Sequence, residues 1–370
     1  MPELTEEQRR AMAVVEARAL GRRAEARARI DASLRFAGVD EADYREALDR
    51  LRREVKVVIA FHPERSSRGG RSVAEGLLAD GIYRTQFETG LSGGSTSAFA
   101  GGARDQWERR LFDGAYHHPG SNLADRPKYG SLFLVAHPDG PAPRFGSCYF
   151  VLRPEISARC SFTILGSQED RAPERMGTLE IFEPVMADLL QHVKEESAPL
   201  GVAGLTVRDL IAALHAGVPC APRGVSSDRL GRALDSFVEA QVHGPVELAR
   251  DVEGLVVDAS FRGTPTADTL GEIASTYDLS LSWHPGFALA LEEVPETFRD
   301  YPTRRLAERI STGAPIDAPA IGAAENDFVL NPEAWSSFGS PSEVRTCFRR
   351  LWHALVLLGS PSDQQSGRAG

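Results

Sequence analysis

Three short segments place polar side chains where they could bind or act on a ligand. The first, "GIYRTQFETG", has Arg84 beside Tyr83 in a stretch whose alternation predicts a strand over residues 82–89. An arginine here can present its rigid guanidinium fork to a phosphate or carboxylate, or it can pair with Glu88 on the surface. The Gly- and Ser-rich loop "GLSGGSTS" follows directly, and its backbone N–H groups can approach a ligand closely.

The second and third segments are predicted strands with polar residues on one face. In "RCSFTILGS", Ser161 and Thr163 share a face, where two hydroxyls can orient a carboxylate or a ribose; β-propensity alone also explains them. In "FVEAQVHG", Glu239, Gln241 and His243 share a face. A solvated sheet face is one interpretation of this row. We favour the other, a hydrogen-bonding row suited to a sugar or amide ligand.

Other kinds of site lack their patterns. Of the nine histidines, His117 and His118 are adjacent, and no H-E-x-x-H is present, so no metal site is expected. The chain has no G-x-S-x-G, no P-loop and no G-x-G-x-x-G after a strand, which argues against a serine hydrolase and against the two common nucleotide-binding motifs. The four cysteines lack metal-ligand spacing and are expected to be reduced thiols: Cys148, Cys160, Cys220 and Cys347.

Charge and hydropathy limit the partners. The net charge of −10 offers no basic field for bulk nucleic acid, although a nucleotide pocket needs only a few arginines. No apolar stretch approaches the roughly 18 residues that span a membrane, and no secretory signal is seen. We therefore expect a soluble cytoplasmic protein with no membrane partner. Leaderless export, as an injected toxin or effector would use, is compatible with the same sequence.

The elements that must position these residues predict an α+β fold in three segments. Residues 1–55 are expected to form an N-terminal helical cap, with Thr5 as N-cap and a second helix over 40–53. Its arginines between Arg18 and Arg29 are interleaved with Ala and are expected to form a solvated face.

Residues 56–295 are expected to form the core, and residues 296–370 a C-terminal helical extension with a polar tail. In the core, strand patterns cluster and helices are inserted between them, which does not fit a doubly wound parallel sheet. Helices are expected in "SVAEGLLADG", ending at Gly81, at 183–196, at 206–216, in "DRLGRALDSF" and "TADTLGEIASTY", and at 345–358; strands are expected in "VKVVIAFHP", "YGSLFLVAHP", "GSCYFVLRP", "LVVDASF" and "LSLSWHPGFAL", besides the three segments above.

Taken in chain order, Arg84, Ser161 with Thr163, and Glu239 resemble the R-S-E class of ADP-ribosyltransferases. Residues 56–292 also resemble an uncharacterised bacterial family that carries stretches similar to "YRTQFETG", "RPKYGSL", "RFGSCYFVLRPE", "EAQVHG" and "SWHPGF". The resemblance implies an ADP-ribosyltransferase-like split β-sandwich with inserted helices, NAD as a substrate, and no metal.

The resemblance also implies roles for individual residues. Arg84 would hold the diphosphate or ribose of NAD, Ser161 would position the carboxylate and the nicotinamide ribose, and Glu239 would bind the 2′-hydroxyl of that ribose. The chain departs from the class in two ways: the spacings are long, and Phe237 stands where the acceptor-site Glu or Gln is usual, with Gln241 after Glu239 instead. The predicted catalytic residues are Glu239, Ser161 and Gln241; the predicted cofactor-binding residues are Arg84, Tyr83, Thr163, His243 and Tyr129.

Cleavage of the nicotinamide–ribose bond explains why these residue types suit the reaction. The ribose becomes oxocarbenium-like, and a carboxylate on the neighbouring hydroxyl stabilises that charge. Nicotinamide leaves as a neutral molecule and needs no general acid, so one carboxylate is enough for catalysis, where a glycosidase uses two. An aromatic side chain must stack on the nicotinamide, and the candidates are Phe87, Tyr129 and Tyr149. The expected activity is mono-ADP-ribosyl transfer from NAD to a protein side chain; an NAD glycohydrolase and a silent nucleotide- or partner-binding module are the alternatives.

Overall fold

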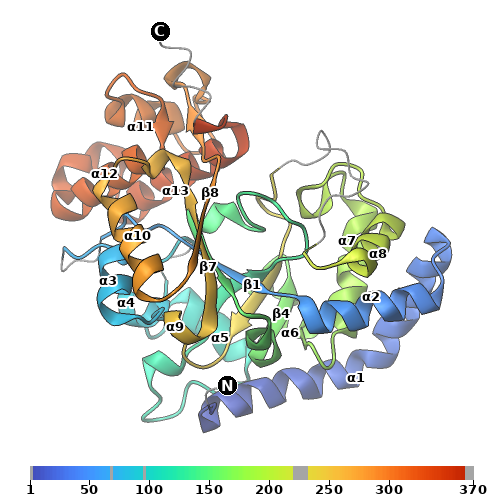
Figure 1. Ribbon diagram of the computed structural model, residues 1–370. Coiled ribbons are helices and arrows are strands. Elements are labelled where there is room, and N and C mark those ends of the chain that lie inside the picture. Colours follow the sequence, from blue (N-terminus) through green and yellow to red (C-terminus); the bar gives the residue numbers. More distant parts are fainter. Residues whose placement is uncertain (1–2, 67–69, 95–96, 220–231, 363–370) are drawn as a thin grey trace.

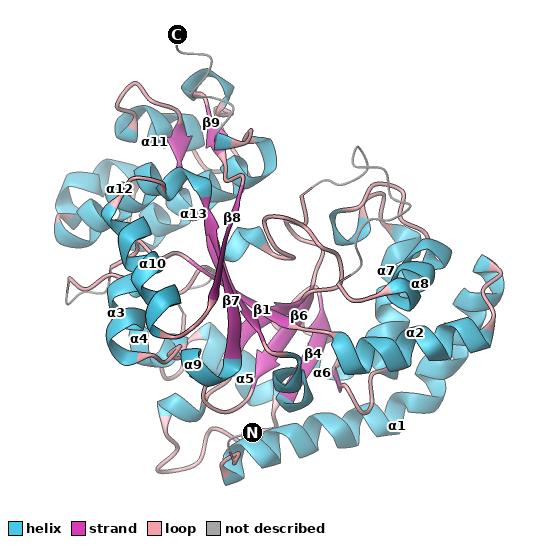
Figure 2. Cartoon of the chain, viewed as in Figure 1, coloured by secondary structure: helices cyan, strands magenta, loops and turns pink. Residues whose placement is uncertain are grey.

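The computed structural model describes residues 3–66, 70–94, 97–219 and 232–362 (Figure 1). Figure 1 shows a central sheet between two groups of helices, with α1, α2, α7 and α8 on one side and α10 to α13 on the other. Figure 2 shows how much helix surrounds that sheet. The predicted α+β class is confirmed. No helix in the described part of the chain is long and apolar enough to cross a membrane.

Eight strands form one sheet in the order β5-β4-β6-β2-β1-β3-β7-β8. Neighbours are antiparallel except β7 and β8, which are parallel. The strands are β1 Val57–Phe61, β2 Lys128–Leu132, β3 Cys148–Leu152, β4 Cys160–Ile164, β5 Gly177–Thr178, β6 Val238–Val242, β7 Val252–Asp258 and β8 Ser280–His284. A separate ribbon pairs β9 Ala288–Leu289 with β10 Ile316–Asp317. This pairing does not establish two facing sheets, so the split β-sandwich stays a prediction.

The α-helices are α1 Glu6–Ala37, α2 Glu41–Glu54, α3 Val73–Asp80, α4 Gln86–Thr89, α5 Ala103–Leu111, α6 Ala172–Arg175, α7 Glu183–Glu195, α8 Val207–Ala216, α9 Leu248–Asp251, α10 Pro265–Thr276, α11 Thr303–Ile310, α12 Ala318–Leu330 and α13 Pro341–Leu358. Short 3-10 turns lie at Leu123–Asp125, Pro143–Phe145, Pro154–Arg159, Pro199–Gly201, Ala259–Phe261, Leu291–Glu293 and Pro332–Phe338.

The sheet has one apolar and one polar face near β6. Val238, Ala240 and Val242 point into the main hydrophobic core. On that face Phe162 of β4 contacts Phe182 beside α7, with ring centroids 5.9 Å apart. Paired residues point to the same face of a sheet. The opposite face carries Ser131, Glu239 and Thr163 in one row across β2, β6 and β4, and Tyr129, Gln241 and Ser161 in the next.

The N-terminal helices form as predicted, and the arginine run also makes ion pairs that sequence reasoning did not predict. Thr5 caps α1 in a capping box with Gln8. One oxygen of Glu183, a buried residue of α7, accepts hydrogen bonds from Arg23 (2.7 Å) and Arg27 (3.2 Å). These arginines are partly exposed, as predicted, and they also pair with acids on α7, which docks α1 against it.

The predicted strand over residues 82–89 is also wrong. Only Ile82 makes a strand-like bridge, to Glu247, and α4 follows. Thr85 and Glu88 form a capping box: the Thr85 hydroxyl accepts from the Glu88 N–H (3.2 Å), and the Glu88 carboxylate accepts from the Thr85 N–H (2.8 Å). Gly90 then ends the helix at a φ of 67°. Local capping therefore outweighs the apolar alternation of this segment.

Some expectations fall partly outside the described residues. In the helix predicted for "DRLGRALDSF", residues 228–231 lie outside them, and residues 232–237 are not helical. Cys220, the "STS" beginning at Ser95 and most of the polar tail also include residues outside the described ranges. In the C-terminal extension, α13 begins at Pro341, earlier than predicted, because Ser340 caps it.

Candidate functional site

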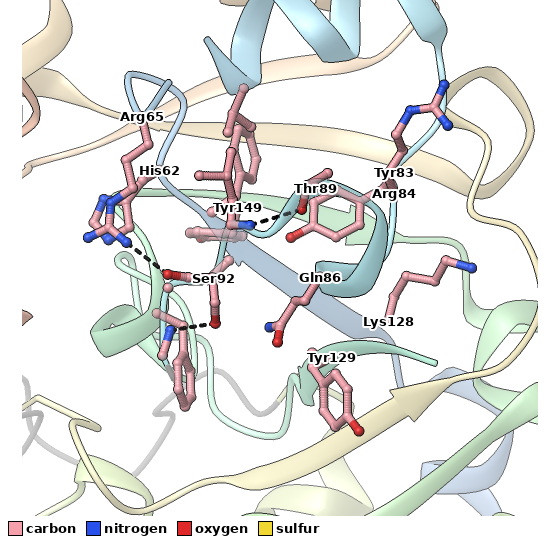
Figure 3. Close-up of a pocket in the computed structure, with 18 of the residues that line it drawn as sticks. His62, Arg65, Tyr83, Arg84, Gln86, Thr89, Ser92, Lys128, Tyr129 and Tyr149 are labelled. Atoms are coloured by element: carbon pink, nitrogen blue, oxygen red, sulfur yellow. Dashed lines mark hydrogen bonds between the residues drawn. The ribbon is translucent and has the colours of Figure 1, made fainter. Parts of the chain in front are cut away.

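A cavity of about 350 Å³ lies on the polar face of the sheet. This volume is within the range of ligand pockets, about 300–1,000 Å³. Strand residues on its wall are Val58, Ala60, Phe61, Lys128, Tyr129, Gly130, Ser131, Tyr149 and Glu239; loop and helix residues include Tyr83, Arg84, Gln86, Gly93, Gly94 and Arg104. In Figure 3 the Tyr83 and Tyr129 rings and the Gln86 amide surround the same space. The cavity therefore brings together segments that are distant in sequence.

Part of the predicted glycine loop forms one side of the cavity. Gly93 and Gly94 line it. A Cβ at Gly93 would lie 1.8 Å from the Phe145 carbonyl oxygen, so only glycine lets the two backbones pack this closely. Arg349 of α13 donates to the Gly94 carbonyl (3.1 Å), which ties this loop to the C-terminal helices.

Glu239 presents a carboxylate that is held at one oxygen. The residue is 7% exposed and lines the cavity. Its Oε1 accepts hydrogen bonds from the Ser167 N–H (3.1 Å) and from Gln241 Nε2 (2.9 Å). Its Oε2 has no hydrogen-bond partner among the described residues. The carboxylate is thus fixed in orientation while one oxygen stays available to a ligand.

A buried chain of hydrogen bonds leads to this carboxylate from behind. Gln241 Oε1 lies 2.8 Å from Ser161 Oγ, Ser161 Oγ lies 3.2 Å from His243 Nε2, and His243 Nδ1 lies 2.6 Å from the Tyr116 hydroxyl. An ionised carboxylate only accepts, so Gln241 must direct its NH₂ group at Glu239 and its oxygen at Ser161. Ser161 then donates to Gln241 and accepts from His243 Nε2–H, which leaves Nδ1 to accept from Tyr116. Every donor in the chain therefore points toward Glu239.

The electrostatics of His243 agree with this chain. Complete burial lowers its pKa to about 3, with Arg159 and Lys128 adding to the effect. The imidazole is therefore neutral near pH 7 and carries a single N–H, as the chain requires. Arg159 also donates to the His243 carbonyl.

The predicted row is real, but only one member of it reaches the cavity. Glu239 lines the wall, whereas Ser161, Gln241 and His243 are completely buried behind it. Thr163, predicted to bind a cofactor, is also completely buried, and its hydroxyl has no hydrogen-bond partner among the described residues. Ser161, Gln241 and His243 are therefore connected to the cavity only through Glu239, and Thr163 has no hydrogen bond to that chain.

Arg84 lies at the cavity edge between two acids. Its side chain is 46% exposed and pairs with Asp80 (3.1 Å) and Glu88 (3.2 Å). The pair with Glu88 is the surface alternative considered from sequence. In Figure 3 the Arg84 guanidinium points away from the Tyr83 and Tyr129 rings. Its charge is therefore largely neutralised before any ligand binds.

Three tyrosines, Tyr83, Tyr129 and Tyr149, supply aromatic surface to the cavity. The Tyr129 hydroxyl donates to Glu108 Oε1 (2.8 Å), and the Tyr149 hydroxyl donates to the Pro138 carbonyl (2.9 Å). Both rings are thus fixed by their hydroxyls. Phe87 does not line the cavity and instead packs under the Arg126 guanidinium, 4.5 Å from its ring centroid.

Several cavity residues were missed from sequence. Lys128 donates to the carbonyls of Ala124 (3.0 Å) and Gly244 (3.1 Å), and burial lowers its pKa to about 8. His62 follows β1 with Nδ1 3.1 Å from Glu64; burial lowers the pKa of His62 and raises that of Glu64 to about 7. The sequence did indicate His62 and Glu64, because both lie in "FHPER" at the end of a predicted strand, and functional residues often lie in the loops that follow strands.

Within the described ranges, no group of three or more His, Cys, Asp or Glu residues is placed to hold a metal ion. The buried Glu64 carboxylate contacts a histidine, and the cavity acids Asp80 and Glu88 contact arginine. These acidic side chains are therefore occupied by protein partners.

Comparison with known proteins gives one family. The sequence profile of the family described as "Protein of unknown function (DUF3626)" matches residues 56–358. No curated protein matches the chain. The match starts where the predicted core starts and continues through α13. Since it covers well over half of the chain, the protein belongs to the DUF3626 family.

Proposed function

We propose that this protein is an NAD-consuming mono-ADP-ribosyltransferase that modifies a protein side chain, with the split β-sandwich fold of that class. One observation carries the proposal: a buried carboxylate, Glu239, is held at Oε1 and offers Oε2 to a cavity lined by aromatic rings. A single oriented carboxylate is what the cleavage of a positively charged leaving group requires. We place the reaction in the cytoplasm, with NAD and a protein acceptor as partners.

In the proposed reaction the bond between C1′ of the ribose and the nicotinamide nitrogen breaks, and its electron pair leaves with nicotinamide. Positive charge then develops on C1′ and the ring oxygen. Glu239 Oε2 would accept a hydrogen bond from the ribose 2′-hydroxyl and so stabilise that positive charge. The acceptor nucleophile forms the new bond to C1′ and loses a proton. The hydrogen-bond chain behind Glu239 supports this role, because it holds the carboxylate in one orientation toward the cavity.

The cavity aromatics support binding of the nicotinamide ring. Tyr129 and Tyr149 line the cavity and have fixed rings, and Tyr83 lines it as well. Phe87, the remaining candidate from sequence, lies outside the lining. We therefore assign nicotinamide stacking to the tyrosines.

Water in place of a protein acceptor is the second candidate, and Phe237 favours it. This residue stands two before Glu239, where an acceptor-activating Glu or Gln is usual in the class. It is 2% exposed and packs edge-on against Phe145, with ring centroids 5.4 Å apart. No polar group at this position is available to receive a proton from a protein acceptor, whereas an NAD glycohydrolase does not need one there.

Incubation with NAD labelled in the ADP-ribose part separates these functions. Free nicotinamide together with labelled protein supports the transferase, and nicotinamide without labelled protein supports the glycohydrolase. Release should be unchanged by EDTA. If the wild-type protein releases no nicotinamide with cell extract present as a source of acceptors, both activities are excluded, and the catalytically silent binding module remains.

A further inference from the structure

We propose that Arg104 binds the anionic part of the ligand, a phosphoryl group of the dinucleotide, and that it rather than Arg84 supplies the positive charge of the site. The identity of the anion as part of NAD rests on the proposed function. The existence of an anion site at Arg104 rests on the contacts of this side chain alone.

Arg104 is a buried cation that forms no ion pair with any residue that the structure describes. The residue is 8% exposed and lines the cavity from the first turn of α5. Its Nε and Nη1 are buried and have no hydrogen-bond partner in the described part of the chain. A buried charge that is neither paired nor hydrogen-bonded is costly, so such groups are rare outside functional sites.

The nearest acids are committed to other groups. Glu108, one turn along α5, accepts from Tyr129 at Oε1 (2.8 Å) and from Arg126 at Oε2 (2.8 Å). Asp105 accepts from Arg126 (2.7 Å) and from the Gly101 N–H (2.9 Å). Neither carboxylate forms an ion pair with Arg104 within 4 Å. The local acids therefore pair directly with Arg126, and Glu108 acts on Arg104 only as a nearby charge, with no hydrogen bond or ion pair to it among the described residues.

The guanidinium of Arg104 is held by rings instead. It lies over the Tyr129 ring at 4.2 Å and over the Trp107 ring at 5.4 Å from the centroids. The backbone before it is also fixed, because the Arg104 N–H donates to Ser97 Oγ (3.1 Å). Stacking leaves the in-plane N–H groups of a guanidinium free to donate, which suits a phosphoryl oxygen.

The other described cations on the cavity wall already have partners. Arg65 pairs with Glu325 (2.6 Å), Arg84 with two acids, and Arg71 lies 4.0 Å from Asp80. Lys128 donates to two carbonyls. Arg104 is thus the cavity cation for which a bound anion replaces a missing partner rather than displacing one. Gln86 Oε1, buried without a partner on the same wall, adds an acceptor for a neutral part of the ligand.

Calorimetric titration of Arg104→Gln tests the assignment with four probes: NAD, ADP-ribose, inorganic pyrophosphate and nicotinamide. We expect about 10- to 100-fold weaker binding of the three anionic probes, because one charge-assisted pair is lost. Nicotinamide affinity should be unchanged. Arg109→Gln is the matched control, because Arg109 is an exposed residue of the same helix outside the cavity. Removal of an unpaired buried charge should leave thermal stability equal or higher, which confirms that the variant folds.

The outcomes separate this inference from the proposed function. If wild type binds pyrophosphate but not NAD, and Arg104→Gln loses pyrophosphate, the anion site stands and NAD is the wrong ligand. If wild type binds NAD and Arg104→Gln binds it equally well, the assignment of Arg104 is wrong while the function survives. A loss in Arg84→Gln without a loss in Arg104→Gln would return the role to Arg84. If wild type binds none of the anionic probes, the inference is overturned.

Discussion

The held carboxylate of Glu239 lets the contribution of its charge be tested without changing its shape. Glu239→Gln retains an oxygen that can accept the Ser167 N–H but removes the negative charge. We expect NAD affinity to change little and nicotinamide release to fall about 100-fold or more, on the scale of losing one electrostatic stabiliser. Equilibrium titration and single-turnover kinetics measure the two effects separately. Near-normal release from this variant would move the reaction to another residue, with Glu88 the next to test.

Ser161 supports Glu239 through Gln241, so its loss should act on both stability and rate. Ser161→Ala leaves the Gln241 oxygen and the His243 N–H buried without partners, which costs about 1–3 kcal/mol of unfolding free energy. The turnover number should fall, but less than in Glu239→Gln, because the charge remains and only its orientation loosens. The Michaelis constant for NAD should stay nearly constant.

Thr178→Val is the matched control for Ser161→Ala. Thr178 is paired with Ser161 across β5 and β4 and is buried, yet its hydroxyl has no hydrogen-bond partner among the described residues. Removing that hydroxyl should leave turnover unchanged. Equal effects of the two substitutions on turnover would contradict the positioning role of Ser161.

Sequence predicted the positions of the row but not its construction. Residues two apart on a strand must share a face, so grouping Glu239 with Gln241 and His243 needed only the strand prediction. The residues that cover this face decide which member of the row reaches the cavity. Here they are Tyr116 and other residues after α5, and no local sequence pattern predicts that they cover it. Arg104 could not be recognised for a related reason: its lack of a partner depends on where Arg126 directs Glu108.

At the scale of elements, α1 is held to α7 by an ion pair whose acid is buried and whose arginines are partly exposed. Arg23→Ala with Arg27→Ala should lower the free energy of unfolding by about 1–3 kcal/mol, because Glu183 would stay buried without a cation. Chemical denaturation measures the loss. Arg10→Ala with Arg35→Ala, at exposed positions of the same helix, is the control and should cost less than about 0.5 kcal/mol.

The ion pairs of Glu183 with Arg23 and Arg27 also make the stability of the protein depend on pH, in a direction that follows from the pKa of Glu183. Hydrogen bonds from Arg23 and Arg27 help to lower the pKa of Glu183 below its ordinary value of 4.5, against the effect of burial. The stability it contributes is therefore present above about pH 4.5 and is lost as pH falls through the lowered pKa. The double arginine variant should lose this acid sensitivity. If the unfolding free energies of wild type and variant differ by the same amount from pH 3 to 7, these ion pairs do not stabilise the folded protein.

Most elements were predictable where a pattern was strong. The strands around the site follow from apolar and β-branched runs, and α1 follows from a stretch rich in Ala and charged residues that begins after the N-cap Thr5. Helices α2, α7 and α8 were predicted close to their observed bounds. Helix α5 was missed because its sequence, "ARDQWERRL", is mostly polar, and Leu111 is the one apolar residue among the four that it buries. The strand over 82–89 failed because a threonine and a glutamate three residues apart start a helix more strongly than alternation maintains a strand.

At the scale of the molecule, the C-terminal helices complete the core beside the cavity. Asn326 of α12 donates to the Glu64 carbonyl (2.9 Å), and a Cβ at Gly322 would lie 2.0 Å from the Glu64 side chain. His62 contacts Trp352 of α13 edge-on, at 4.9 Å between ring centroids. The segment predicted as an extension therefore packs directly on the residues that follow β1.

Glu64 makes this junction sensitive to pH. Burial raises its pKa from 4.5 to about 7, so the folded protein binds this proton more tightly than the unfolded chain. Its contribution to stability is greatest below about pH 4.5 and declines as pH rises toward 7. The lowered pKa of His62 acts in the opposite direction below pH 6.5, so the wild-type profile alone does not isolate Glu64.

Comparison with Glu64→Gln isolates the effect of Glu64. The unfolding free energy of wild type minus that of the variant should fall by up to about 3 kcal/mol between pH 4.5 and 8. Urea denaturation at each pH measures it. Glu75→Gln should show the reverse trend, because the capping box of α3 lowers the pKa of Glu75. A flat difference for Glu64→Gln would mean that this carboxylate is not buried in the folded protein.

The direction of the chain behind Glu239 has a consequence for protons. Tyr116, His243 and Ser161 could each pass a proton along, but the last donor is the Gln241 amide, which does not give up a proton near neutral pH. The carboxylate is therefore polarised from behind yet insulated from proton exchange on that side. In the proposed reaction, a released proton would therefore leave through the cavity, on the Oε2 side. Under this proposal, the hydrogen-bond chain would act on Glu239 from inside the sheet, and protons would move on the opposite side, in the cavity.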